Sequence, residues 1–157
     1  MKKALHIIKN ILVWLIAAIA VLMMVFTIVS VNTFDRADRT IFGYKAFIVL
    51  SDSMSATDFS AGDLILVREA DPATLQAGDI ISYQSTNEEN YGEVVTHKIR
   101  ERTTDENGSP GFVTYGTTTG ENDENVVTYS FVLGKYQMRL PGVGQFFQFL
   151  KTTPGYI

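Results

Sequence analysis

Residues 64–99 read LILVREADPATLQAGDIISYQSTNEENYGEVVTHKI, and this stretch decides the expected fold. It contains three short apolar runs rich in β-branched residues, and turn-forming residues separate them. Further runs of this kind lie at 47–50, 112–115 and 126–136. After the N-terminal apolar run, only residues 71–76 have the pattern of a helical turn. The sequence therefore predicts a mainly β domain, either a small barrel or a sandwich.

The N-terminal part has a different pattern. Residues 11–31, ILVWLIAAIAVLMMVFTIVSV, carry no charge. As a helix they would extend about 32 Å, which matches the hydrocarbon core of a bilayer. The run is longer than the roughly 7–15 apolar residues of a cleaved secretory signal. It predicts one uncleaved transmembrane helix in the cell membrane.

The charges beside this run predict its orientation. Three lysines precede it, whereas the acidic and basic residues that follow it cancel. The positive-inside rule then places residues 1–10 in the cytoplasm. Residues 32–45 would form a juxtamembrane linker, and residues 46–157 an extracytoplasmic domain. Residues 140–150 are apolar but too short to span a bilayer, so they could belong to the core or rest on the membrane surface.

Composition excludes several classes of function. From position 35 onward the chain has ten basic and 17 acidic residues, a net charge of −7, which disfavours binding to nucleic acid. There is no cysteine and there are only two histidines, so thiol catalysis and the common zinc sites are not expected. No calcium-binding loop motif is present either, and we expect no metal or cofactor. A hydrolase of this composition needs an activated hydroxyl or a carboxylate pair.

One histidine and one serine-containing segment are candidates for such chemistry. His97 lies in a predicted strand, where alternation gives it the same face as Val95 and Ile99. It could be a core histidine, or a partly dehydrated imidazole that acts as a base. The segment Ser51-Asp52-Ser53-Met54 follows an apolar run, at a place where loops often present reactive groups. By itself it could equally be a turn that contains two serines.

These elements, taken in order, resemble type I signal peptidase. The anchor is followed by Ser-x-Ser-Met, by Gly-Asp-Leu-Ile at residues 62–65, by Gly-Asp-Ile-Ile at 78–81 and by Val-Thr-His at 95–97. The resemblance is to the Ser-His branch of the endoplasmic reticulum, archaea and SipW-like bacterial proteins. It implies a β-rich protease fold that removes signal peptides from exported preproteins. The implied partners are preprotein signal peptides, the lipid bilayer and the protein-export translocon.

The resemblance also implies roles for individual residues. The serine directly before Met, Ser53, would be the nucleophile, and the histidine of Val-Thr-His, His97, the general base. The acidic partner of the histidine falls on Asp123, seven positions after Gly116 in the family's spacing. A slip of one or two residues would select Glu121 or Glu124 instead.

Other positions remain open. Ser51 would donate a hydroxyl to the oxyanion, beside the backbone N–H of Ser53. Thr117 stands where the family has a supporting aspartate, and Ala56 stands where it usually has proline. Lys98 offers a rival base, because another bacterial branch uses a Ser-Lys dyad. A different class of function, a non-catalytic membrane-anchored binding or surface-assembly module on this fold, also fits these departures.

Overall fold

The computed structural model describes residues 2–33, 40 and 42–150. The chain divides into two compact units, residues 1–39 and 40–157. Residues 34–39 and 41 of the predicted linker, and residues 151–157 at the end of the predicted outer domain, lie outside the described residues. The first strand begins at Tyr44, so regular structure starts inside the segment predicted as linker.

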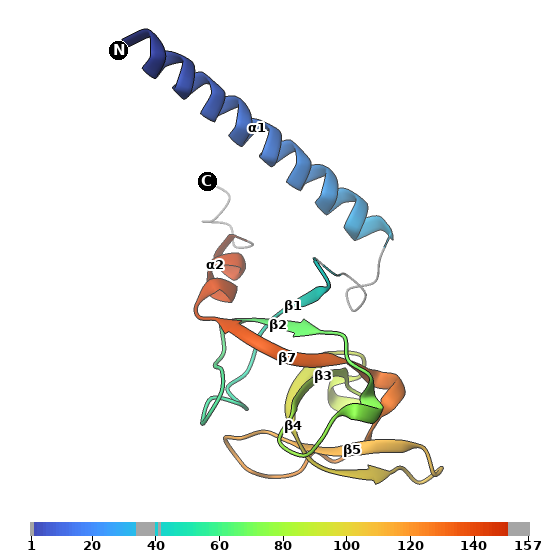
Figure 1. Cartoon of the computed structure of the whole chain (residues 1–157). Coiled ribbons are helices and arrows are strands. Elements are labelled where there is room, and N and C mark those ends of the chain that lie inside the picture. The colour runs from blue at the N-terminus through green and yellow to red at the C-terminus, as the bar shows by residue number, and fades with distance from the viewer. Residues whose placement is uncertain (1, 34–39, 41, 151–157) are drawn as a thin grey trace. The chain divides into compact units, whose positions relative to one another are not determined.

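The first unit holds the helix α1 (Lys2–Thr33), which covers the predicted anchor at 11–31 (Figure 1). The segment contains neither proline nor glycine, the two residues that most disfavour the helical state. Among the residues whose side chains are described, no helix is both long and apolar enough to span a bilayer. The helix predicted for residues 11–31 is present within α1.

The second unit is built on one antiparallel sheet of seven strands. Its strands are β1 (Tyr44–Ile48), β2 (Leu64–Arg68), β3 (Ile80–Gln84), β4 (Val94–Thr104), β5 (Pro110–Tyr115), β6 (Val127–Thr128) and β7 (Val132–Leu140). Their order in the sheet is β1-β2-β7-β3-β4-β5-β6. No pairing joins β1 to β6 among the described residues, so hydrogen bonds do not close the sheet into a barrel. The prediction of a mainly β domain is confirmed.

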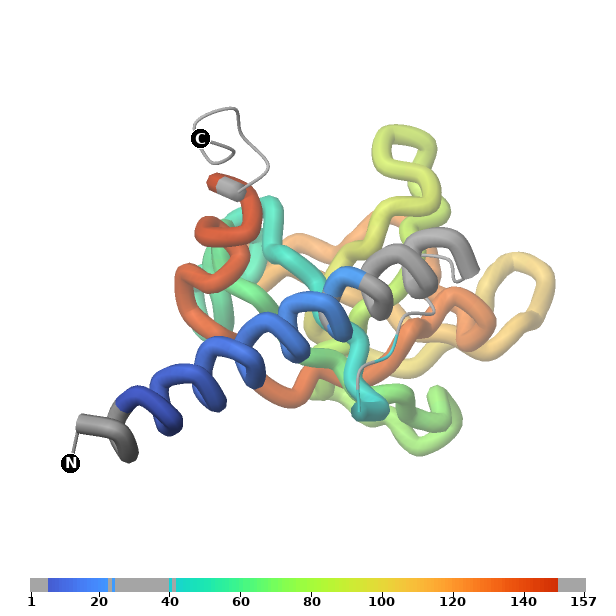
Figure 2. The backbone as a smooth tube through the Cα atoms, turned by 90° about the horizontal axis from the view of Figure 1, so that it is seen from above, coloured from blue at the N-terminus to red at the C-terminus, as the bar shows by residue number. Residues whose placement is uncertain are grey.

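The strand order divides the sheet into two parts. Strands β1 and β2 form one part, and β3 to β6 form the other. Strand β7, the last in the sequence, pairs with both β2 and β3 and so joins the parts, which do not pair directly. Figure 1 shows β7 crossing the middle of this unit. In Figure 2 the loops around residues 85–93 and 104–110 project from the unit at separate places.

The core consists of two hydrophobic clusters, and β3 contributes to both. Alternation along the strand directs Ile81 and Tyr83 into one cluster and Ile80 into the other. The first cluster contains Leu75, Ile81, Tyr83, Ile99, Phe112 and Val127, and the second contains Met54, Phe59, Ile65, Val67 and Ile80. The residue that follows Ser53 is thus a core residue, which fixes the chain beside the serine.

The predicted turns are confirmed where residue chemistry determines them. The Asp71 side chain accepts a hydrogen bond from Ala73 N and caps a short 3₁₀ turn within residues 71–76. In the two Gly-Asp turns, the carboxylates of Asp63 and Asp79 each accept a hydrogen bond, 3.1 Å long, from the backbone N–H three residues earlier. Both turns lead directly into strands, as their sequences predict.

Two predictions about secondary structure are wrong. The run at 126–136 is not one strand: a 3₁₀ turn at Tyr129–Phe131 separates β6 from β7. In this turn the Tyr129 ring stacks on Phe112, with 5.2 Å between ring centroids, and the chain then continues into the middle of the sheet. The second error concerns residues 143–150, which form the helix α2 (Val143–Leu150) although no helix is predicted there. Its three phenylalanines are 46–59% exposed, so the interpretation of this segment as core is wrong for them.

Candidate active site

Ser53 lies in the loop between β1 and β2, and its neighbours hold the loop in place. Met54 is completely buried in the second core cluster. On the other side, the Asp52 carboxylate accepts a hydrogen bond of 2.9 Å from Ala61 N, across the base of the loop. The carbonyl of Ser53 itself accepts a hydrogen bond of 2.9 Å from Thr118 N. Ser53 is therefore a partly exposed hydroxyl on an anchored backbone.

His97 lies in β4, and the predicted alternation of its strand is observed. Ile99, on the same face, is buried in the first cluster. Lys98 faces the other way and forms an ion pair with Asp58 at 3.5 Å. His97 is not a core histidine, because its two ring nitrogens contact groups of the loops: Nε2 lies 3.0 Å from Ser53 Oγ, and Nδ1 lies 2.7 Å from Asp123 Oδ2.

Asp123 lies in the loop between β5 and β6. Its N–H donates to the Thr114 carbonyl at 2.8 Å, which ties the loop to β5. Neither neighbouring acid has a hydrogen bond or ion pair with His97 among the described contacts. Glu124 accepts a hydrogen bond from the Asn87 amide at 3.0 Å, and Glu121 is exposed. Of the three acidic residues that the sequence left open, Asp123 is the one in contact with the imidazole.

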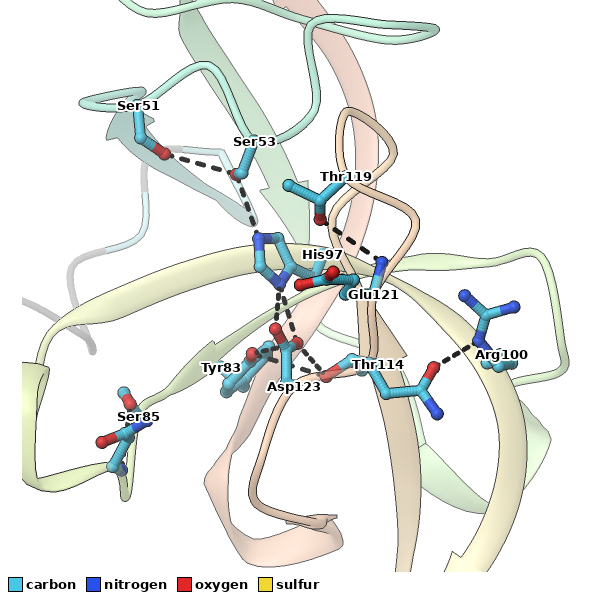
Figure 3. A network of polar contacts seen from close by, with 12 residues as sticks. Ser51, Ser53, Tyr83, Ser85, His97, Arg100, Thr114, Thr119, Glu121 and Asp123 are labelled. Carbon is cyan, nitrogen blue, oxygen red and sulfur yellow. Dashed lines mark hydrogen bonds and ion pairs between the residues drawn. The ribbon is translucent and has the colours of Figure 1, made fainter.

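Hydrogen bonds connect Ser51, Ser53, His97 and Asp123 in a series (Figure 3). Ser51 Oγ donates to Ser53 Oγ at 3.3 Å. If His97 Nδ1–H donates to the Asp123 carboxylate, Nε2 is free to accept the Ser53 hydroxyl proton. This is the tautomer that a general base next to a serine needs.

The carboxylate of Asp123 has further hydrogen-bond donors that the sequence did not reveal. Burial alone would raise its pKa, but hydrogen bonds from His97, Thr114 and Tyr83, together with the charge of His97 when protonated, outweigh burial and lower that pKa. Thr114 Oγ1 lies 2.6 Å and Tyr83 OH 3.0 Å from Oδ2. Burial and the adjacent carboxylate in turn raise the pKa of Tyr83. Asp123 thus remains ionised, and Tyr83 remains a neutral donor, at neutral pH.

Ser51 and Thr117, the two residues expected to support the catalytic groups, have different surroundings. The Ser51 hydroxyl contacts Ser53, within reach of any group that binds there. The Thr117 hydroxyl is buried and has no hydrogen-bond partner among the described residues. Within that part of the chain, no cluster of three or more histidine, cysteine, aspartate or glutamate side chains is arranged to hold a metal ion.

Gly116 is a further site residue that the sequence did not single out as important in itself. A Cβ atom at this position would lie 2.9 Å from the Ser53 carbonyl oxygen, 3.2 Å from Ser53 Cβ and 3.4 Å from His97 Nε2. Only glycine lets the two loops approach so closely. In the sequence, the residue is only a glycine that directly follows a predicted strand. Such glycines are too common to be recognised as site residues without the structure.

A groove of about 220 Å³ lies beside Ser53. Apolar and polar groups both line it: Phe47, Ile48, Val49, Leu50, Ser51, Ser53, Phe59, Ile65, Asn90, Glu93, Val94, Val95 and Thr96. A groove of this kind next to a paired serine and histidine is a candidate site for binding a substrate.

Comparison with known proteins adds no relative. No protein-family model matches the chain, and no curated protein matches it either.

Proposed function

We propose that this chain is a serine endopeptidase that removes N-terminal signal peptides from exported preproteins. The observation that carries the proposal is the continuous hydrogen-bonded series from Ser53 through His97 to Asp123. These residues are 44 and 26 positions apart in the sequence, so no local constraint brings them together. The resemblance to type I signal peptidase supports the same three residues in the same roles.

The geometry supports a specific sequence of steps. Ser53 Oγ attacks the scissile carbonyl carbon while His97 Nε2 takes its proton. The backbone N–H of Ser53 and the Ser51 hydroxyl would donate to the oxyanion. His97 then gives the proton to the leaving amine, and the signal peptide remains as an ester on Ser53. Water, deprotonated by His97, hydrolyses this acyl-enzyme. Asp123 holds the imidazole and stabilises its protonated form.

The membrane location of the proposal rests on the sequence alone. The uncharged run at 11–31 and the three lysines before it support a single-pass protein with a cytoplasmic N-terminus. In that location the domain would stand where signal peptides leave the bilayer, beside the translocon. Extraction of membranes at high pH tests this part separately: a membrane-spanning chain stays in the pellet, whereas a peripheral one is released.

Cleavage by the purified full-length chain tests the activity. A preprotein with small residues at positions −1 and −3, the family's preference, should yield a mature product whose N-terminus mass spectrometry identifies. The matched substrate has a bulky aromatic residue at −1 and should remain intact. Absence of cleavage of any preprotein, with the chain folded, would contradict the proposal.

The identity of the triad acid yields a quantitative prediction. Replacing Asp123 by Asn should lower kcat about 10⁴-fold, because the amide no longer stabilises the protonated imidazole or fixes its tautomer. The matched controls are Glu121→Gln and Glu124→Gln, which should change kcat less than threefold. A large loss in either control, with Asp123→Asn close to wild type, would move the role to the neighbouring acid.

The close contact at Gly116 yields a second prediction. Gly116→Ala should lower kcat roughly 100-fold, because the added methyl group lies within 3.4 Å of both Ser53 and His97 and must displace one of them. The thermal unfolding midpoint and the activity of Thr119→Ala, an exposed change in the same loop, serve as controls. Normal cleavage by a folded Gly116→Ala variant would show that the two loops need not approach this closely.

A further inference from the structure

The Asp123 carboxylate lies on a loop and is held by side chains from neighbouring strands. It is carried by the connection between β5 and β6, whereas His97 belongs to a strand in the sheet. A catalytic carboxylate must keep its orientation to well within an ångström to be effective. Besides His97, two side chains hydrogen-bond it: Tyr83 from β3 and Thr114 from β5.

The two hydroxyls come from the strands on either side of β4. The sheet order places β3 and β5 next to β4, so Tyr83 and Thr114 flank the strand that carries the imidazole. Figure 3 shows them on the two sides of the carboxylate. Thr114 is completely buried and Tyr83 is 5% exposed, so neither hydroxyl has water as an easy alternative partner.

The hydrogen bonds also meet at one atom. Asp123 Oδ2 accepts from Thr114, from Tyr83 and from His97 Nδ1, whereas Oδ1 has a contact of 2.9 Å with the same nitrogen. Two donors fixed in the sheet therefore prevent the carboxylate from rotating away from the imidazole. Phenylalanine and valine would fill the same space in the core, so packing alone does not explain the hydroxyls.

We propose that Tyr83 and Thr114 are positioning residues for the proteolysis proposed above, and that their hydroxyls together hold the Asp123 carboxylate against His97 Nδ1. The inference rests on the proposed function, because it assigns these residues a role in that reaction. Neither residue touches the substrate; both act through Asp123.

The isosteric variants Tyr83→Phe and Thr114→Val test this role on the full-length chain. Each should lower kcat about three- to tenfold with KM unchanged, because a hydrogen bond to a buried charge is lost while the groove is intact. The matched control is Tyr129→Phe, which removes a tyrosine hydroxyl beside the same cluster but has no hydrogen bond to Asp123. It should cleave as the wild type does.

A double-mutant cycle separates positioning from a general structural effect. In the Asp123→Asn background, Tyr83→Phe and Thr114→Val should cause no further loss, because the group through which they act is already disabled. A loss of equal size in both backgrounds would overturn the inference. So would wild-type kcat in both single variants when the wild-type chain cleaves normally. Failure of the wild-type chain to cleave would instead count against the proposed function.

The pH profile gives a readout that a merely structural role would not move. The titratable groups around the carboxylate are His97 from β4, Tyr83 from β3 and Glu124 in its own loop. Loss of a donor raises the pKa of Asp123, because fewer hydrogen bonds then offset the cost of burying its charge. The pH profile of the Asp123 carboxyl ¹³C resonance should therefore have its midpoint at higher pH in both variants and an unchanged midpoint in Tyr129→Phe. An unmoved midpoint in both would contradict the inference.

The Nδ1 proton of His97 gives a measurement that needs no substrate. A proton hydrogen-bonded between imidazole and carboxylate resonates far downfield, and His6 is the only other histidine in the chain. This resonance should shift or broaden in Tyr83→Phe and in Thr114→Val, and it should be absent in His97→Ala. An unchanged resonance in both positioning variants would overturn the inference whatever the chain cleaves.

Discussion

Replacing Ser53 by alanine should lower kcat for preprotein cleavage about a million-fold and leave the fold intact. Among the described residues, the Ser53 hydroxyl is the only group with a hydrogen bond to His97 Nε2, at 3.0 Å. Losses of this size are typical when the nucleophile of a serine protease triad is removed. Product formation by the purified variant, followed over hours, measures the residual rate.

The matched control for this experiment is Ser55→Ala. Ser55 lies in the same loop and is exposed, but its hydroxyl contacts Thr118 rather than His97, at 3.3 Å. It should retain kcat within about threefold, while both variants unfold near the wild-type temperature. If Ser53→Ala supports normal function in cells, the chain is better described as a binding module that retains the fold of a protease.

Replacing His97 by alanine should cause a loss of similar size, about a million-fold in kcat. Without the imidazole, Ser53 has no base to accept its proton. The Asp123 carboxylate would still receive hydrogen bonds from Thr114 and Tyr83, so the variant should fold. The measurement is again product formation by the purified variant over hours, with a thermal melt to confirm folding.

Lys98→Ala is the matched change in the same strand, and it decides between the two candidate bases. Lys98 projects from the opposite face and pairs with Asp58, so its loss should change kcat less than tenfold. A lysine base would also have to lose its proton near neutral pH, which requires strong desolvation, and the Lys98 side chain is 22% exposed. Full activity in His97→Ala together with loss in Lys98→Ala would transfer the role to the lysine.

Much of the fold could be predicted because strand periodicity is a local property. The alternation around His97 correctly separated Ile99 from Lys98, since successive side chains in a strand point to opposite faces. The Gly-Asp turns were predictable for the same reason, because their hydrogen bonds span only three residues.

The helix α2 was missed for a physical reason. Val143, Phe146, Phe147 and Leu150 recur at the i, i+3, i+4 and i+7 spacing of one helix face, but Phe149 interrupts this pattern. The helix also has only eight residues, fewer than the roughly 11–18 over which a helical period is normally recognised. The place of β7 between β2 and β3 was also not predictable, because strand order depends on contacts between residues distant in the sequence.

The candidate site was predictable in part. The resemblance in motif spacing selected Ser53, His97 and Asp123, but Glu121 and Glu124 stayed open as alternatives to Asp123, because a slip of one or two residues in a loop changes the answer. Tyr83 and Thr114 gave no signal at all. A tyrosine in an apolar strand and a threonine in a β-rich run are ordinary strand residues, and only the paired register reveals that their hydroxyls meet at one carboxylate.

The position of β7 has a consequence for how the molecule is made. Ribosomes release a chain from its N-terminus, so residues 132–140 emerge after every other strand of the sheet. Until they arrive, the β1–β2 hairpin, whose loop carries Ser53, is not connected through the sheet to β4, which carries His97. A nascent polypeptide would therefore complete its sheet only near the end of synthesis, and a truncated copy lacking this strand would lose the sheet connection between the part that carries the nucleophile and the part that carries the base.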